Sequence, residues 1–226
     1  MIKVHHLENS RSQRVVWLLE ELGAEYEIVT YRRDPKTMLA PASLKQVHPL
    51  GKSPVITDEA YDGRVIAESG AIIEYLLARF DDGSLSPTAG SDESLRYRFW
   101  LHHAEGSAMP PLVMSLVFSM LGKPPVPALI RPIGKLLGQG VQKKFLDPQI
   151  KDLLALWEAE LVRSTWFAGE AFSAADIQMS FPLLAADMRR GLDDYPALQS
   201  ALARIRERPA YQRTVAQIGE FSSPGR

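Results

Sequence analysis

The chain has 226 residues, of which 23% are charged and 46% hydrophobic, and a formal net charge of −1; this balance is ordinary for a globular protein with a sizeable core and gives no reason to expect nucleic-acid binding. It contains no cysteine, which excludes disulfides, thiolate metal ligands and a cysteine nucleophile. We expect a cytoplasmic protein without a membrane partner, because the N-terminus lacks a signal-peptide pattern and no apolar run reaches the roughly 20 residues that span a bilayer.

The first 80 residues alternate between strand and helix patterns. Strands are predicted at residues 2–7, 26–31, 55–58 and 64–67, the last two joined by an Asp62-Gly63 turn. Helices are predicted over residues 12–22, 41–47 and 69–80, and the first and third of these have apolar residues at helical spacing. The order βαβ followed by αββα predicts a thioredoxin-like α/β domain at residues 1–80.

Only helical patterns follow the linker predicted at residues 81–90. Apolar residues at helical spacing indicate helices around residues 95–103, 150–161 and 196–207, the last of which Pro209 stops. Prolines between residues 124 and 132 predict a kinked or broken segment. A capping-box spacing at Ser173 and Asp176 predicts a further helix start. Residues 91–226 are therefore predicted to form an all-helical domain.

Two neighbouring features of the first domain suit the binding of a small peptide. Pro54 has no N–H to donate to a sheet, so it belongs at the first residue of a strand, where its neighbours' amides stay free for an extended ligand. Ser69 is a good helix N-cap, and helix N-termini attract anions. Together these elements predict a site that holds a peptide by its backbone and its carboxylate.

These motifs also carry a family resemblance. The run His-Pro-Leu-Gly-Lys-Ser-Pro-Val at residues 48–55, followed by Glu-Ser-Gly-Ala-Ile at 68–72, resembles the glutathione-binding half of the soluble glutathione S-transferases. Ser-Arg-Ser-Gln-Arg at residues 10–14 is similar to the serine-type, bacterial and fungal group of that family. The resemblance implies glutathione as co-substrate, a detoxification role, no metal, a cis peptide bond before Pro54 and a homodimer.

The residue that activates the thiol is expected between the first strand and the first helix. Ser10 is the candidate, because its hydroxyl would donate to a thiolate that also meets the free amides and dipole of the helix N-terminus. Some branches of the family place the working serine or asparagine one residue earlier, which keeps Asn9 as a second candidate. The structural alternative is that Ser10 only caps the helix.

The resemblance also assigns the parts of glutathione to individual residues. The α-amine would bind Glu68 and the adjacent carboxylate would bind Ser69, while the glycyl carboxylate would bind Lys52. The backbone of Val55 would pair with the cysteinyl portion as an added strand. The substrate-binding residues expected in this way are Lys52, Ser53, Pro54, Val55, Glu68 and Ser69.

A second substrate pocket is predicted from residues 106–146, which contain no acidic residue but five cations and many apolar residues. This pattern indicates an apolar pocket with a mildly positive rim. The alternatives are a buried helix with an irregular apolar loop, or a contact with a membrane or a partner. The candidate lining residues are Tyr97, Trp100, His103 and Met109. Glu105 is predicted to reach a glutathione bound in a second subunit.

The sequence therefore predicts a glutathione transferase that ionises the thiol for attack on small hydrophobic electrophiles. Two alternatives remain open. One is a glutathione-dependent peroxidase or disulfide oxidoreductase that works without a catalytic cysteine. The other is a binding or regulatory protein that keeps the fold and the glutathione site but has no activity.

Overall fold

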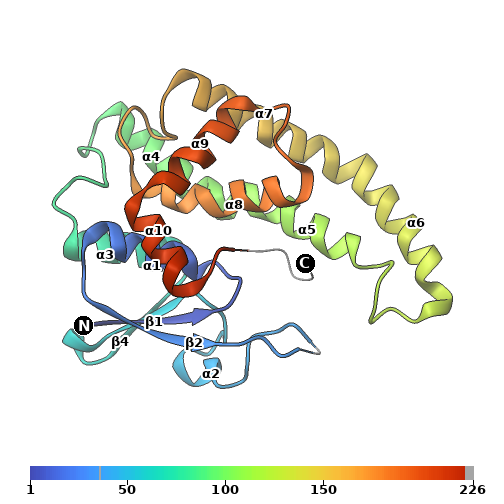
Figure 1. The fold of residues 1–226 in the computed structure, drawn as a ribbon, viewed down its shortest axis with the longest axis horizontal. Coiled ribbons are helices and arrows are strands. Elements are labelled where there is room, and N and C mark those ends of the chain that lie inside the picture. The colour runs from blue at the N-terminus through green and yellow to red at the C-terminus, as the bar shows by residue number, and fades with distance from the viewer. Residues whose placement is uncertain (36, 222–226) are drawn as a thin grey trace.

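The computed structural model describes residues 1–35 and 37–221, and it combines a small mixed sheet and its helices with a helical region (Figure 1). The strand order is β2-β1-β3-β4. The strands are β1 (Ile2–Leu7), β2 (Tyr26–Tyr31), β3 (Val55–Asp58) and β4 (Arg64–Ala67). β1 runs parallel to β2, whereas β3 is antiparallel to both β1 and β4. The predicted thioredoxin-like arrangement is confirmed.

Three helices accompany the sheet: α1 (Ser12–Leu22), α2 (Leu44–Val47) and α3 (Ser69–Phe80). α1 and α3 lie on the side of the sheet that faces the helical region, and α2 lies on the other side (Figure 1). The run Val15 to Leu19 in α1 is completely buried. α1 therefore packs against the sheet and the helical region at once, and its N-terminus is held at the boundary between them.

Seven α-helices make up the rest of the described chain. They are α4 (Asp92–His103), α5 (Met109–Ser119), α6 (Arg131–Val141), α7 (Asp147–Arg163), α8 (Ala174–Arg190), α9 (Pro196–Glu207) and α10 (Pro209–Ile218). Single π-helical turns at residues 104–108 and 142–146 join α4 to α5 and α6 to α7. The paired helices α5 and α6 extend away from the sheet (Figure 1). No helix in the described ranges is long and apolar enough to cross a bilayer.

α8 is the central helix of this region, and its start is fixed by the predicted capping box. The Asp176 carboxylate accepts hydrogen bonds from the backbone N–H groups of Phe167 (2.8 Å) and Ser173 (2.9 Å) and from the Ser173 hydroxyl (2.9 Å). The bond from the Ser173 N–H is the part of a capping box in which the third helical residue accepts from the N-cap amide. The three bonds together also tie the preceding loop to α8.

A buried arginine from α1 completes the backbone hydrogen bonding of α8. Pro182 lies inside α8 and has no N–H, so the carbonyl of Gln178, four residues earlier, lacks its helical donor. Arg14 reaches this carbonyl from α1, and its Nη1 donates to Gln178 O at 2.9 Å. The Arg14 side chain is only 1% exposed. The Arg14 side chain of α1 therefore supplies the hydrogen-bond donor that Pro182 removes from α8.

The predicted elements agree with the structure at most boundaries. The four strands, the helix over 12–22, the helix over 69–80 and the stop of α9 before Pro209 are confirmed. The helix expected from residue 41 begins at Leu44 and is preceded by a turn. Pro110 and Pro111 are the second and third residues of α5, directly after the π-helical turn at 104–108. α10 was not predicted.

Candidate functional site

Ser10 lies where β1 leads into α1, and its hydroxyl belongs to a short chain of polar groups. Ser10 Oγ is 2.8 Å from Ser12 Oγ, and Ser12 Oγ is 2.8 Å from His6 Nδ1. The Ser12 backbone N–H also donates to Ser10 Oγ (3.3 Å). Ser10 is 7% exposed. Arg11, not Ser10, is the N-cap of α1, but the Ser10 hydroxyl accepts from the first N–H of that helix and has a hydroxyl partner that can orient its proton.

Asn9 precedes Ser10 in a left-handed conformation with φ of 50°, which asparagine tolerates better than most residues. Its side chain is exposed, and its backbone carbonyl accepts a hydrogen bond from Arg33 Nη2 (3.1 Å). Asn9 lines both a small crevice beside Ser10 and a larger apolar cavity. The structure therefore keeps both thiol-activating candidates at the N-terminus of α1.

The predicted peptide-binding residues form one polar cavity of about 250 Å³. The Ser53-Pro54 peptide bond is cis, as expected from the resemblance. The Ser53 hydroxyl donates to His5 O (3.0 Å) and lies 3.5 Å from Ser10 Oγ. Val55 does not line the cavity with its side chain, which is completely buried at the start of β3. The predicted residues that line it are Lys52, Ser53, Pro54, Glu68 and Ser69.

Glu68 and Ser69 stand where β4 passes into α3. Glu68 is the exposed residue before the helix and has a φ of 72°. Ser69 is the first residue of α3 and is 4% exposed. Its hydroxyl accepts a hydrogen bond from Arg14 Nη2 (2.9 Å). The first turn of α3 and the fixed Ser69 hydroxyl thus present donors of the kind that bind a carboxylate.

A charged cluster of Arg11, Arg14 and Glu105 closes one side of the polar cavity. Glu105 accepts hydrogen bonds from Arg11 Nε at 2.9 and 3.0 Å and from Arg14 Nη2 at 2.5 Å. Burial lowers the pKa of Arg14 to about 10, against the opposing effect of Glu105, so Arg14 remains a cation at neutral pH. Glu105 therefore contacts arginines of its own chain, and its predicted role across a dimer stays a prediction.

An apolar cavity of about 470 Å³ adjoins the polar one, and Arg11 lines both. Of the four predicted lining residues, the structure brings only Met109 to this cavity. Tyr97, Trp100 and His103 lie in the core, because the face of α4 that carries them packs inward. His103 Nε2, for example, accepts a hydrogen bond from the indole N–H of Trp157 (2.9 Å). The apolar wall comes instead from α5 and α8.

His6 gives the site a pH dependence that can be tested. Burial lowers the pKa of His6 to about 4, below the value of about 6.5 in an unfolded chain. Between these values the unfolded chain binds more protons than the folded one, so the free energy of unfolding should fall as the pH drops from about 6.5 to about 4. The fall attributable to His6 is at most about 3 kcal/mol.

The measurement is urea unfolding at about pH 7.5 and about pH 5, on the wild type and His6→Asn. Burial also lowers the pKa of His5 and His103, which adds to the wild-type loss, whereas burial raises the pKa of Asp176 to about 6, which opposes that loss. The variant is expected to lose less stability between the two pH values than the wild type. An identical loss in both proteins would contradict the assignment.

Comparisons with known proteins fit this geometry. The family model described as the N-terminal domain of glutathione S-transferase matches residues 10–79, and that of its C-terminal domain matches residues 111–209. Glutathione S-transferase 1 of Saccharomyces cerevisiae is 33% identical over 93% of this chain and 92% of its own length. This chain belongs to the glutathione S-transferase family. Glutathione S-transferase 3 of Schizosaccharomyces pombe is 38% identical over 82% of this chain and 74% of its own length.

A solved structure supports the same assignment of this glutathione S-transferase. The crystal structure of a glutathione S-transferase from Actinobacillus pleuropneumoniae is 32% identical, with a TM-score of 0.78, and the match covers 96% of this chain and 93% of the other. Family membership supports transferase activity, and the thioredoxin-like and helical regions are those of the family. Within the described ranges, no group of three His, Asp or Glu residues is placed to hold a metal ion.

Sequence reasoning did not assign a role to several residues of this transferase site. Arg11 and His48 both line the polar cavity, and Arg14 fixes Ser69. The Arg14 position was visible in the sequence as the arginine four residues after Ser10, but its partners come from three other segments. Arg11 gave no signal of its own, because a surface loop offers no pattern that separates a site cation from a solvated one.

Proposed function

We propose that this protein binds glutathione in the 250 Å³ polar cavity and directs its ionised sulfur toward an electrophile in the 470 Å³ apolar cavity. The observation that supports this best is the junction of the two cavities at Arg11, next to Ser10 and the N-terminus of α1. A polar pocket for a tripeptide and an apolar pocket for a second reactant meet at the place where a thiolate would be stabilised.

The glutathione would lie between β3 and α3. Its γ-glutamyl end would meet Glu68 and the Ser69 hydroxyl, and its glycyl carboxylate would meet Lys52. Its cysteinyl backbone would pair with Val55. This placement satisfies each charged group of the peptide with an opposite charge or with donors of a helix N-terminus. It leaves the sulfur as the part that points toward α1.

Ser10 would stabilise the thiolate. A free cysteine thiol has a pKa near ~8.5, and lowering it by two units corresponds to roughly 2.7 kcal/mol of preference for the thiolate. A hydrogen bond to a charged group supplies about 1.5–3 kcal/mol, so one hydroxyl together with the α1 amides is enough.

The neighbours of Ser10 would orient its proton. His6 is neutral at working pH because burial lowers its pKa to about 4. If its proton is on Nδ1, His6 donates to Ser12 and Ser12 donates to Ser10. The Ser10 proton, which otherwise points to Ser53 Oγ at 3.5 Å, can then turn to the sulfur. The opposite tautomer reverses the chain and turns the Ser10 proton away. We assign the first arrangement to the glutathione complex.

Loss of the γ-glutamyl contacts should weaken glutathione binding without stopping the chemistry. Glu68→Gln and Ser69→Ala are each expected to raise the KM for glutathione about tenfold to a hundredfold, the effect of one charged hydrogen bond, while kcat changes little. Steady-state kinetics with a chloronitrobenzene measures both constants. Glu74→Gln, an exposed acid later in α3, is the matched control and should leave KM unchanged.

The experiment that tests the proposed function compares two glutathione-dependent reactions. Turnover of a chloronitrobenzene reports conjugation, and turnover of hydroxyethyl disulfide reports disulfide reduction. Conjugation is expected to be the faster reaction relative to its uncatalysed rate. If disulfide reduction is the more strongly accelerated reaction, the protein is an oxidoreductase and not a transferase. The absence of both activities, with glutathione still bound, would make the protein a binding protein.

A further inference from the structure

We infer, resting on the proposed function, that the second substrate is an amphipathic anion: a long apolar molecule that carries a carboxylate away from its reactive carbon. The apolar cavity is lined by four cations and by no acidic residue among those the structure describes. Its walls are apolar side chains of α5 and α8, such as Leu112, Leu116 and Phe181. The cations that line it are Arg11, Arg33, Lys123 and Arg189.

Three of these cations have no acidic partner inside the described ranges. Arg11 is the exception, because Glu105 already neutralises it. Arg33 is held by three backbone carbonyls, those of Glu8, Asn9 and Met38, which position its guanidinium. It forms no ion pair in the described ranges, although the Glu8 carboxylate is near enough to stabilise its charge in part. Lys123 and Arg189 have neither an ion pair nor a side-chain hydrogen bond with any described residue. Their charge is therefore available to a ligand.

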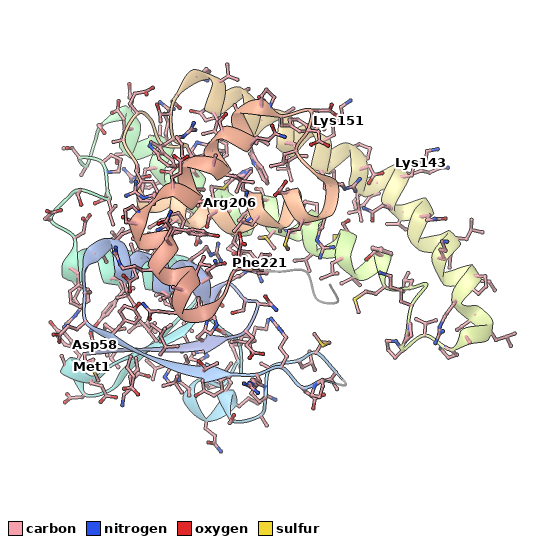
Figure 2. The ribbon with its side chains drawn as sticks, viewed as in Figure 1. Met1, Asp58, Lys143, Lys151, Arg206 and Phe221 are labelled. Carbon is pink, nitrogen blue, oxygen red and sulfur yellow. The ribbon has the colours of Figure 1, made fainter. Side chains whose placement is uncertain are left out.

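Other cations nearby are either paired or directed away from the apolar cavity. Arg190 follows Arg189 in the same helical turn, but it lies outside the apolar cavity and pairs with Asp147. Partial burial, and to a smaller extent the proximity of Arg190, lower the pKa of Arg189. Lys143 also belongs to the acid-free segment 106–146, but it is exposed on the π-helical turn at 142–146 and points away from the body of the protein (Figure 2). Only some of the cations of this region border the cavity.

The cations also come from different parts of the fold. Arg33 follows β2, Lys123 follows α5, and Arg189 is in the last turn of α8. Phe221, which lies beyond α10 and packs on Phe181 with ring centres 4.4 Å apart, adds an aromatic wall (Figure 2). Arginine guanidinium groups bind carboxylates through paired hydrogen bonds. A ligand with an apolar chain would pack against the apolar side chains of the cavity, and its carboxylate would pair with the cations that line it.

Binding can be tested without catalysis. Laurate and dodecanol share an apolar chain and differ in charge, and calorimetry below the micelle concentration measures the affinity of each. Laurate is expected to bind at least about tenfold more tightly. Arg189→Gln should remove most of this difference, and the matched control Arg190→Gln should keep it. Equal affinities for the two ligands, or equal losses in both variants, would overturn the inference.

Catalysis separates this inference from the proposed function. The substrates are a long-chain enone carboxylic acid and its methyl ester, in which the reactive carbon is too far from the carboxylate for the charge to alter its reactivity. The acid is expected to have a kcat/KM at least about fivefold higher, with Arg189→Gln raising KM for the acid alone. Equal efficiency for acid and ester would refute the anion preference and leave the transferase activity standing. Failure to conjugate either substrate, by protein that does conjugate a chloronitrobenzene, would refute the inference alone. Failure with all three substrates would refute the proposed function as well.

Discussion

Replacing Ser10 by alanine is expected to lower the turnover of glutathione conjugation at least about tenfold, because the thiolate loses its hydroxyl donor. Glutathione should still bind, since Lys52, Glu68 and Ser69 are untouched. The drop should shrink as the pH is raised through the thiol's own pKa, where ionisation no longer depends on the enzyme. Steady-state rates across that pH range, with calorimetry for glutathione affinity, measure both effects.

The comparison that decides between the two candidates is Asn9→Ala. If Ser10 is the donor, the Asn9 variant should keep most of its turnover, and a larger loss in Asn9→Ala than in Ser10→Ala would move the role to Asn9. Ser12→Ala is expected to give an intermediate loss, because it leaves Ser10 in place but removes the group that orients its proton. Loss of the bond from the Ser12 N–H to the Ser10 hydroxyl costs about 1 kcal/mol of stability, which thermal unfolding measures separately.

The second large effect is expected at Arg14. Arg14→Met should lower the free energy of unfolding by about 3 kcal/mol, because the carbonyl of Gln178 and the hydroxyl of Ser69 lose a buried charged donor. The KM for glutathione should rise as well, since Ser69 is no longer fixed at the cavity. Arg14→Lys should recover only part of the stability, because one ammonium group does not reproduce the fork of a guanidinium. Urea unfolding measures these differences.

A double-mutant cycle tests the reason for this role. Pro182→Ala supplies the N–H that α8 lacks and gives the Gln178 carbonyl a partner within its own helix. Arg14→Met should therefore cost about 1 kcal/mol less in the Pro182→Ala background than in the wild type. A cost that is the same in both backgrounds would show that Arg14 stabilises the protein through Glu105 and Ser69 alone.

Local patterns explain why the first domain was predictable. Pro54 and Asp62-Gly63 mark strand boundaries, and Ser69 marks a helix start, so their roles follow from backbone chemistry within a few residues. The same holds for the capping box at Ser173 and Asp176. At the strand boundaries and at the capping box the structure agrees, because the interactions are local. At Ser69 the helix starts where predicted, but Glu68 is the N-cap and the Ser69 hydroxyl bonds Arg14, 55 positions away.

The rest of the site depends on contacts that no local pattern contains. The pairing of Arg14 with Gln178 joins residues 164 positions apart, and that of Arg11 with Glu105 joins residues 94 positions apart. The helical spacing of Leu95 and Phe99 predicted the α4 helix, but these two side chains are exposed in the structure. The face of α4 that packs into the core carries Tyr97 and Trp100 instead. The absence of acidic residues from segment 106–146 was visible in the sequence. Which of its cations borders the cavity was not, and the structure shows that Lys123 does.

The most direct test of the central claim is a pH titration of the thiolate absorbance of glutathione bound to the protein. Bound glutathione is expected to ionise with an apparent pKa about two units below the value of about 8.5 for a free thiol, and Ser10→Ala should return that pKa most of the way. An unshifted thiol pKa in saturated wild-type protein would contradict the account. So would an equally lowered pKa in the Ser10→Ala variant.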